Sequence, residues 1–298
     1  MRTCIDGSCF LTPHPTGVTI AAQALLRSGQ LDIEGGEVVS YRLEPPTTEQ
    51  KAQLPFSWTH KRVPSRLIHA LCASGVSSFD RLFGPMDRLF LPNLNIVGTP
   101  HVPYDLLVHD ISFLLQPSWF SLKTRIWHTC ARPISLMRGA DRLFTVSEWT
   151  KRDLVEVVKI PEERINVIDI IPTSSLIVPQ PRPISEPYFL LFSAHDERKN
   201  AAVARIAFDA FSHDFPTWKL VLVGAKGPSH TKNVLHLPYL APQEHERWLQ
   251  HAAALLYPSW YEGFGLPAHE ATHRHIPVLA AGNDALAETA PTGTVLLP

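Results

Sequence analysis

Two glutamates near the end of the sequence, Glu262 and Glu270, flank a glycine- and proline-containing stretch within the segment PSWYEGFGLPAHEA at 258–271. Pro267 suits the first turn of a helix, because the N–H group that it lacks would have no partner there. The amides that precede such a helix attract anions, since they lie at its positively polarised end. These amides belong to Phe264, Gly265 and Leu266. We expect Glu262 on the loop and Glu270 one turn inside the helix, beside a bound phosphate; the alternative is an ordinary Gly/Pro turn that leads into a helix.

The same segment resembles the E-x7-E signature of family 4 of the retaining nucleotide-sugar glycosyltransferases, which have the GT-B fold. Three further segments resemble that family in the same order and spacing. They are LFTVSEWTKRDL at 143–154, RKNAAVARIAFDAF at 198–211 and LVLVG at 220–224. The resemblance extends over roughly residues 80–290 and implies a GT-B transferase.

For the donor phosphates, the resemblance implies that Lys199 and the preceding Arg198 hold the diphosphate. Positive charge is needed there because the leaving group gains negative charge in the transition state. Many members carry an arginine five positions before the lysine, where this chain has Ala194. The resemblance therefore assigns the charge to Arg198 and Lys199; the alternative for Lys199 is an exposed lysine near a helix start.

For the sugar and the nucleoside, the resemblance implies that Glu262 accepts hydrogen bonds from the transferred sugar and Glu270 from the ribose diol. Tyr239 and Leu240 match the segment that contacts the nucleobase mainly through its backbone. His109, in VHD at a strand end, matches a histidine often found near the sugar, although a buried structural histidine fits equally well.

Gly17, in PTGV, resembles the glycine loop of the first domain that approaches the donor, but the arginine of the usual G-x-G-R pattern is missing. The family has no obvious protein nucleophile, and the resemblance implies front-face attack in which the leaving phosphate takes the acceptor's proton. The fifteen histidines include no H-E-x-x-H spacing. Protein charges would neutralise the diphosphate, so we expect no metal and no other cofactor.

Residues 111–140 contain no acidic side chain, although they carry four basic ones and several aromatic ones. The basic residues are Lys123, Arg125, Arg132 and Arg138, and the aromatic ones include Trp119, Phe120 and Trp127. A basic, aromatic surface over 118–138 would suit an anionic membrane face near a lipid-linked sugar acceptor. A solvated helix face with its core aromatics fits at least as well.

Strand-like and helix-like segments alternate on both sides of 172–187, a stretch that holds five prolines. Before it, the spacing predicts strands at 3–5, 37–43, 105–109, 142–146 and 165–170, and helices at 17–29, around 118–138 and after Ser147. After it, the spacing predicts strands at 188–193, 219–223, 234–237, 253–257 and 276–280, and helices at 200–213, 243–252 and 267–274.

Strands separated by helices predict parallel sheets with right-handed crossovers. We therefore expect an α/β protein with two doubly wound, Rossmann-like domains facing a cleft. The first, on the acceptor side, spans 1–171; a proline-rich linker spans 172–187; the nucleotide-sugar-binding domain spans 188–298. Family members usually continue through several more helices, so the resemblance implies that this second domain is incomplete.

The 298 residues carry a formal net charge of -1, which argues against a nucleic-acid binder. Hydrophobic residues make up 45% of the chain, which excludes disorder as its main state. The four cysteines have no C-x-x-C spacing, the N-terminus has no apolar signal region, and no stretch approaches the ~18 apolar residues of a membrane span. These features predict a reduced cytoplasmic protein, with the membrane contact at the inner face.

The resemblance implies a retaining hexosyltransferase that moves a hexose, such as mannose, from a nucleotide diphosphate sugar to a growing surface glycan or a lipid-linked acceptor. Two alternatives stay open. One is a GT-B-like nucleotide-sugar epimerase or phosphorylase, and the other is a degenerate homologue that binds a nucleotide sugar or a partner without turnover. The intact set of Glu262, Glu270 and Lys199 favours catalysis, whereas Ala194 and the irregular glycine loop favour degeneration.

Overall fold

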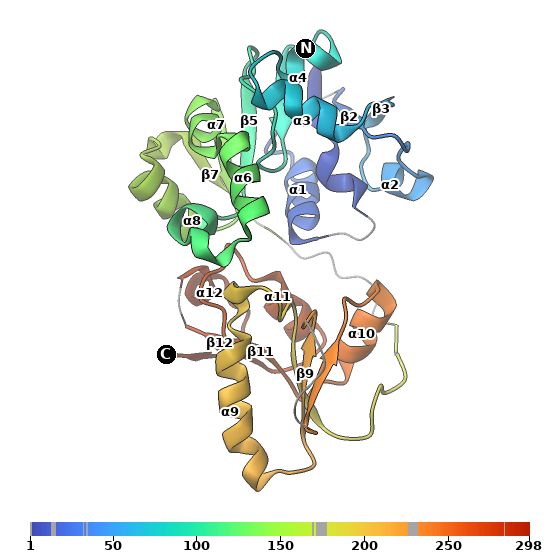
Figure 1. The fold of residues 1–298 in the computed structure, drawn as a ribbon, viewed down its shortest axis with the longest axis vertical. Helices are drawn as coiled ribbons and strands as arrows, with labels where there is room; N and C mark the ends of the chain where they lie inside the picture. Colours follow the sequence, from blue (N-terminus) through green and yellow to red (C-terminus); the bar gives the residue numbers. More distant parts are fainter. Residues whose placement is uncertain are drawn as a thin grey trace. The chain divides into compact units, whose positions relative to one another are not determined.

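The structure is a computed structural model, which describes residues 2–12, 16–31, 33, 35–168, 170, 178–225, 232–282 and 284–298. The chain forms two compact units, Met1–Ile171 and Pro172–Pro298 (Figure 1). Each unit has its own parallel sheet and its own buried core.

The first unit is built on seven parallel strands in the order β3-β2-β1-β4-β5-β6-β7. They are β1 Thr3–Asp6, β2 Glu37–Tyr41, β3 Ser57–Lys61, β4 Arg88–Leu91, β5 Tyr104–Val108, β6 Arg142–Thr145 and β7 Ile165–Val167. The chain runs outward from β1 to β3, returns to β4 beside β1, and continues to β7. This reversal is the doubly wound arrangement that the alternation of elements predicted.

The helices of the first unit fall into four connections between strands and one longer excursion after β5. They are α1 Gly17–Arg27, α2 Thr48–Ala52, α3 Ser65–Ala73, α4 Phe79–Phe83, α5 Ser112–Leu115, α6 Leu122–Ala131, α7 Pro133–Gly139 and α8 Glu148–Asp153. Thr16 caps α1, because its side chain accepts a hydrogen bond from the Thr19 amide.

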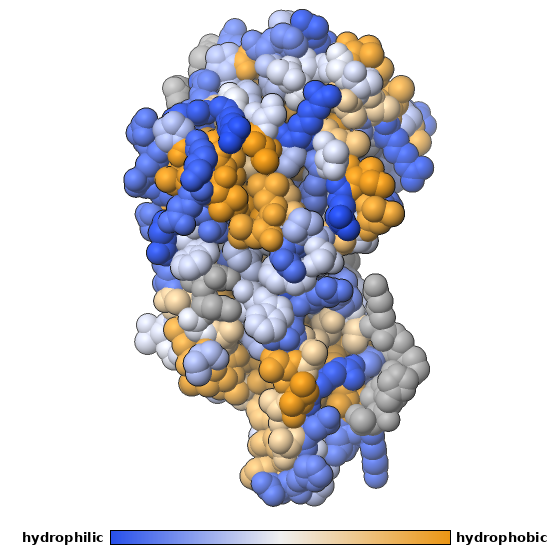
Figure 2. All heavy atoms as spheres, turned by 60° about the vertical axis from the view of Figure 1, so that its left-hand side comes forward, coloured by the Kyte–Doolittle hydropathy of each residue, from blue (hydrophilic) through white to orange (hydrophobic). Residues whose placement is uncertain are grey.

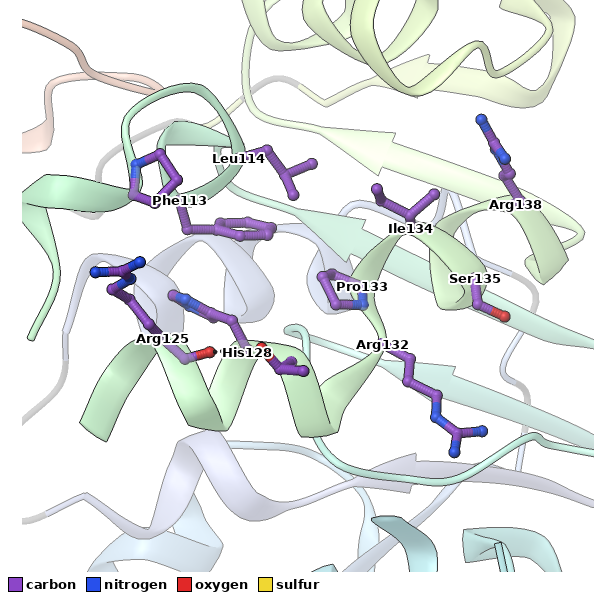
Figure 3. A pocket seen from close by; sticks show the side chains of 11 residues that line it. Phe113, Leu114, Arg125, His128, Arg132, Pro133, Ile134, Ser135 and Arg138 are labelled. Carbon is purple, nitrogen blue, oxygen red and sulfur yellow. Dashed lines mark hydrogen bonds between the residues drawn. The ribbon is translucent and has the colours of Figure 1, made fainter. Parts of the chain in front are cut away.

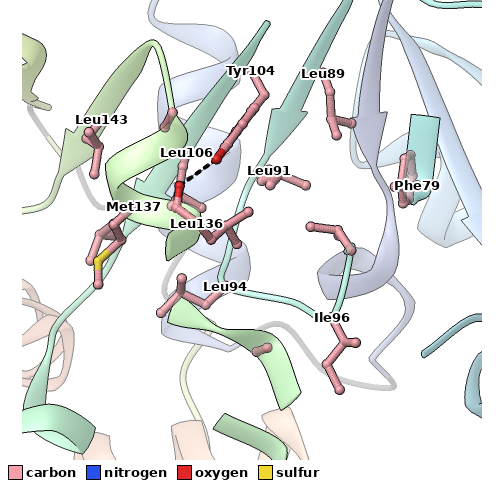
Figure 4. Packing of buried hydrophobic residues seen from close by; sticks show 14 of the residues in the cluster. Phe79, Leu89, Leu91, Leu94, Ile96, Tyr104, Leu106, Leu136, Met137 and Leu143 are labelled. Atoms are coloured by element: carbon pink, nitrogen blue, oxygen red, sulfur yellow. Dashed lines mark hydrogen bonds between the residues drawn. The ribbon is translucent and has the colours of Figure 1, made fainter. Parts of the chain in front are cut away.

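The core of this unit lies on both faces of the sheet. Leu89 and Leu91 of β4 pack in one cluster with Leu136 and Met137 of α7 (Figure 4). Phe90, between them on the strand, is also buried, and the alternation of side chains along a strand turns it toward the other face. The Tyr104 hydroxyl donates a hydrogen bond to the Leu136 carbonyl over 2.7 Å, which ties α7 to β5.

The prediction of one long helix around 118–138 is wrong. A 3₁₀ turn, Pro117–Trp119, comes first, and the helical residues after it are divided into α6 and α7 by Arg132, whose φ of 49° is left-handed. Proline excludes the α conformation from the residue before it and cannot donate to an earlier carbonyl, so Pro133 ends α6 and starts α7. The break turns the chain so that both helices line one pocket.

The second unit has six parallel strands in the order β10-β9-β8-β11-β12-β13. They are β8 Tyr188–Leu191, β9 Lys219–Val223, β10 Val234–Leu237, β11 Ala254–Tyr257, β12 Val278–Ala281 and β13 Thr294–Leu297. The helices are α9 Ala201–Asp214, α10 Pro242–Gln250, α11 Leu266–His273 and α12 Asp284–Thr289. Two Rossmann-like α/β units are thereby confirmed.

Of the predicted linker, residues 172–177 lie outside the described residues. The described part, 178–187, contains no helix or strand and lies along α10, since the Gln180 amide donates to Gln250 Oε1 over 3.0 Å and Arg247 Nε donates to the Pro181 carbonyl over 3.0 Å. No helix within the described ranges combines the length and the apolar character that crossing a membrane requires.

Candidate functional site

Lys199 and Glu262 form a direct ion pair in the second unit, although they are 63 residues apart in the sequence. Lys199 Nζ lies 2.5 Å from Glu262 Oε1, and the two side chains are only 13% and 11% exposed. Lys199 follows β8 and Glu262 follows β11, and these strands are neighbours in the sheet. The pair therefore lies at the carboxyl edge of a parallel sheet, where ligands bind in folds of this class.

Tyr257, the last residue of β11, joins this pair. Its hydroxyl lies 3.3 Å from Lys199 Nζ, and it also hydrogen-bonds Glu262. Burial, and then the negative charge of Glu262, raise the pKa of Tyr257 well above its usual value of 10.0. The phenol thus stays neutral and can accept from the lysine while it donates to the carboxylate.

Arg198 is held mainly by Asp196, two residues before it. Its Nη2 lies 2.8 Å from Asp196 Oδ2, and its carbonyl accepts the Trp260 amide over 2.7 Å. Burial alone would raise the pKa of Asp196, but the guanidinium of Arg198 outweighs it and keeps that pKa below 3.8. Each predicted phosphate-binding cation thus already has a carboxylate partner.

The loop between the two predicted glutamates ends in the helix start that the sequence indicates. Gly265 has a φ of 93°, a left-handed conformation that favours glycine, and a Cβ there would lie 2.5 Å from Leu286 Cδ2, so that the leucine side chain would have to shift. α11 begins at Leu266, with Pro267 in its first turn. The first amide with a backbone partner is that of Ala268, which donates to the Gly265 carbonyl over 2.9 Å. The amides of 264–266 precede this bond and lie at the positive end of the helix.

Two residues that the sequence analysis did not single out hold this loop. The Phe264 ring stacks on His269 with centroids 4.8 Å apart and planes at 12°. The Thr289 hydroxyl donates to the Phe264 carbonyl. Burial lowers the pKa of His269 below 6.5, so a neutral imidazole lies against the ring.

Glu270 carries a partly buried carboxylate that has no hydrogen-bond partner among the described residues. Burial raises its pKa above 4.5. Arg274 lies one turn further along the chain, and its Nε and Nη2 donate to the Glu246 carboxylate at 2.7 and 2.6 Å. Its bond to Glu270 goes to the backbone carbonyl and not to the carboxylate. The Glu270 carboxylate is therefore available to accept hydrogen bonds from a ligand.

Tyr239 and Leu240 follow β10, with Tyr239 70% exposed and Leu240 packed against the core of the unit. Phe192 packs against that core too, and stacks on His245 of α10 with centroids 4.1 Å apart. Burial lowers the pKa of His245 to about 4, so this imidazole is neutral. The sequence analysis did not name Phe192 or His245 as site residues. The signal that could have identified them is position, since Phe192 directly follows β8 and His245 lies in the first turn of α10.

His109 and Gly17 belong to the first unit. His109 Nε2 lies 3.0 Å from the Pro92 carbonyl, to which the ring can donate, and burial lowers the pKa of His109 below 6.5. This bond fits the structural alternative for that residue. Gly17 lies in the first turn of α1 rather than in a loop, and residues 13–15 before it lie outside the described residues.

A family profile described as family 4 glycosyltransferase in conflict systems matches residues 128–290, which is more than half of the chain. The chain belongs to this glycosyltransferase family. The match includes Lys199, Glu262 and Glu270, and the family assignment that the E-x7-E segment suggested is confirmed.

The proteins similar to this family 4 glycosyltransferase include one sequence relative and several solved structures. O-antigen chain mannosyltransferase B of Escherichia coli is 26% identical over 204 residues, or 60% of this chain and 53% of the relative. This chain thus spans about half the length of that relative.

Sucrose-phosphate synthase of Thermosynechococcus elongatus has a TM-score of 0.65 at 16% identity, covering 100% of this chain and 85% of that one. HepE of Anabaena, in complex with UDP and glucose, has a TM-score of 0.59 at 14% identity, covering 99% and 85%. These likenesses concern the fold, which is that of the GT-B glycosyltransferases.

Within the described residues, no three His, Cys, Asp or Glu side chains lie close enough together to hold a metal ion.

Proposed function

We propose that this family 4 glycosyltransferase moves a hexose from a nucleotide diphosphate sugar to a glycan or lipid-linked acceptor, with retention at the anomeric carbon. The observation that carries the proposal is the buried Lys199–Glu262 pair beside the start of α11. The Lys199 cation and the amides of 264–266 can bind a diphosphate, and the Glu262 and Glu270 carboxylates can accept hydrogen bonds from sugar hydroxyls.

When a donor binds, its diphosphate competes with Glu262 for Lys199 and lies against the amides of 264–266. Glu262 is then free to accept hydrogen bonds from the hexose, while Glu270 accepts them from the ribose diol. The pair in the unliganded protein keeps both charges compensated until the donor brings its own. Arg198 can contribute in the same way, because it immediately precedes Lys199 in the turn after β8 and its carbonyl accepts the Trp260 amide of the loop before α11.

In the proposed reaction, the bond between the anomeric carbon and the phosphate oxygen breaks, and its electron pair goes to the diphosphate. The acceptor hydroxyl attacks from the same face, and a phosphate oxygen takes its proton. Lys199, Arg198 and the helix start stabilise the charge that develops on the leaving group. Tyr239 and Leu240 enter this proposal as backbone contacts to the base.

We propose that neither a metal nor another cofactor takes part, since protein cations and amide dipoles supply the positive charge. The sugar is proposed to be a hexose such as mannose, because the sequence relative is a mannosyltransferase of O-antigen chains and HepE was solved with UDP and glucose. The acceptor would then belong to surface polysaccharide synthesis, and the reaction would take place in the cytoplasm at the inner membrane face.

Two measurements test this proposal. Calorimetric titration with GDP, UDP and ADP is expected to show binding of one nucleotide, and the corresponding sugar nucleotides are then assayed for hydrolysis and transfer, with and without EDTA. We expect turnover with retained anomeric configuration and equal rates in EDTA. A protein that binds a nucleotide but turns over no donor would support the non-catalytic alternative, to which Ala194 points; epimerised donor would support the epimerase.

A further inference from the structure

The first unit contains a pocket of about 760 Å³ that no part of the proposed donor site uses. α5 and the turn Pro117–Trp119 form one wall, and α6 and α7 form the other (Figure 3). All of its lining residues lie between Phe113 and Arg138, so the pocket is complete within this unit.

The floor of the pocket is apolar. It is made by Phe113, Leu114, Pro133 and Ile134, which lie in the middle of the view in Figure 3. Phe113 packs on His128 with ring centroids 4.5 Å apart, and burial lowers the pKa of His128 below 6.5, so the imidazole adds no charge at neutral pH.

The rim of the pocket is cationic. Arg125, Arg132 and Arg138 line it, and Figure 3 shows their side chains spread around the apolar centre. Within the described ranges, the guanidinium groups of Arg125 and Arg132 have no hydrogen-bond or ion-pair partner, and the Arg138 side chain donates only to the Val158 carbonyl. The segment 111–140 contains no acid, and the acid next to it, Asp110, acts on His128 of the pocket.

Apolar side chains continue from the pocket onto the surface. Leu122 and Ile126 of α6 are 70% and 56% exposed, and Leu115 and Ile134 are 41% exposed. Figure 2 turns this side forward and shows apolar surface bordered by hydrophilic residues. Exposed leucine and isoleucine beside arginine are the combination that amphipathic helices use at a lipid interface.

We propose that this pocket binds the phosphate-bearing head of an anionic membrane lipid. The phosphate lies against the guanidinium groups of Arg125 and Arg132, which match its geometry. The first part of the lipid chain lies over Phe113 and Ile134, and Leu122 and Ile126 enter the interface. A soluble phosphate would leave the apolar floor and these two side chains in water, so the lipid is the better-matched occupant.

Binding at this pocket goes beyond the proposed sugar transfer, because it gives the first unit an attachment site that works without a donor. It would also bring the protein to a lipid-linked acceptor. The two proposals fail separately, since vesicle binding is measured without a nucleotide and nucleotide binding without vesicles.

Co-sedimentation of the full chain with phosphatidylcholine vesicles, with and without phosphatidylglycerol, tests the site. We expect binding at low salt only where phosphatidylglycerol is present. The double variant R125Q/R132Q should lose about tenfold or more in vesicle affinity. The matched control, R62Q/R66Q, removes two exposed arginines of the same unit outside the pocket and should lose less than about twofold.

A third variant, L122S/I126S, changes only exposed side chains and is expected to weaken binding while keeping its salt dependence. All variants should keep the wild-type Tm and the wild-type affinity for the nucleotide. The proposal is overturned if the wild-type chain does not bind anionic vesicles, or if R125Q/R132Q binds them as tightly as the wild type does. It is also overturned if R62Q/R66Q loses as much vesicle affinity as R125Q/R132Q. A fourth contrary result would be that inorganic phosphate displaces the wild type and L122S/I126S from the vesicles at the same concentration.

Discussion

Lys199 has two possible partners in the proposed cycle, the Glu262 carboxylate and the donor diphosphate. Removing it takes away a contact to developing charge and leaves Glu262 buried without its cation. We expect Lys199→Ala to lower kcat by at least about 10²-fold, the usual effect of losing such a contact. Steady-state transfer kinetics measure the loss.

Lys51→Ala is the matched control for that variant, because Lys51 is exposed and lies in the other unit. Its kinetics should equal those of the wild type. Glu262→Gln, which removes the other member of the pair, should also lose at least about 10²-fold. Undiminished transfer by Lys199→Ala would remove this residue from the mechanism.

We expect Glu270 to make donor binding sensitive to acid. Burial raises its pKa above 4.5, so in the folded protein it takes up a proton at a higher pH than an ordinary glutamate. In the proposed function the ionised carboxylate accepts hydrogen bonds from the ribose diol, whereas the protonated form has lost part of that capacity. Nucleotide affinity should therefore fall as the pH decreases through this raised pKa.

Calorimetric titration over a pH series measures that fall, and Glu270→Gln provides the comparison. The variant should bind more weakly at neutral pH, and its affinity should change much less with acid. If wild type and Glu270→Gln show the same pH profile, another group is responsible for it.

At the scale of the elements, Asp105 connects three neighbouring strands of the first sheet near their amino ends. It lies on β5, is 2% exposed, and accepts two hydrogen bonds each from Arg88 of β4 and Arg142 of β6, at 2.6 to 3.0 Å. Burial would raise its pKa, but the two guanidinium groups outweigh burial and hold the pKa below 3.8.

We expect Asp105→Asn to lower the free energy of unfolding by roughly 3 kcal/mol, because it leaves Arg142 without its counter-charge and Arg88 with only Asp141, 3.5 Å away. Since the folded pKa is depressed, this stabilisation is present above pH 3.8 and is lost as the pH falls through the lower folded value. Urea unfolding at neutral and acid pH measures both effects. Equal acid sensitivity of wild type and variant would assign the pH dependence to other carboxylates.

The Thr289 hydroxyl of α12 bonds both the loop before α11 and the Ala285 carbonyl of its own helix. Thr289→Val keeps the shape of the side chain but removes the hydrogen bond to the Phe264 carbonyl. We expect the donor KM to rise several-fold with little change in kcat, and the free energy of unfolding to fall by about 1 kcal/mol. Thr272→Val is the control, since its hydroxyl bonds only carbonyls of its own helix. Equal KM values in the two variants would mean that Thr289 has no part in positioning the loop.

The sequence predicted most elements that have a clear period. The strands at 219–223 and 234–237 agree residue for residue with β9 and β10, and α9 begins one residue from its predicted start. β3 was missed because SWTHK is a polar edge strand without strict alternation, and β4 because a buried strand of four residues is too short to show a period. The break at Arg132 was visible in Pro133, but the apolar spacing on either side hid it.

The candidate site was predictable as a set of residues but not as an arrangement. Glu262, Gly265 and Pro267 identified the loop and helix through local chemistry. The contact of Lys199 with Glu262 depends on β8 lying beside β11, and strand order is a property of the whole sheet. Tyr257 and Thr289 have no sequence signal of their own, because only their packing brings them to the loop.

At the scale of the whole molecule, each unit has a separate core. One cluster, from Cys4 to Ile165, belongs to the first unit, and clusters that begin at Tyr188 and Leu191 belong to the second. The residues proposed to bind the nucleotide all lie in the second unit. A ligand stabilises only the cooperative unit that contains its site, by an amount set by its concentration relative to Kd.

We therefore expect two unfolding transitions in scanning calorimetry, of which the nucleotide raises only one. At a concentration of 100 Kd the gain is about 2.7 kcal/mol. Asp105→Asn assigns the transitions, because it lowers only that of the first unit, whereas Thr289→Val acts only on the second. The prediction is contradicted if the nucleotide shifts both transitions equally, or if it shifts the transition that Asp105→Asn lowers. Either result would mean that the binding energy of the nucleotide is not confined to the unit that contains Lys199, Glu262 and Glu270. Contacts to the donor would then have to be sought in the first unit as well.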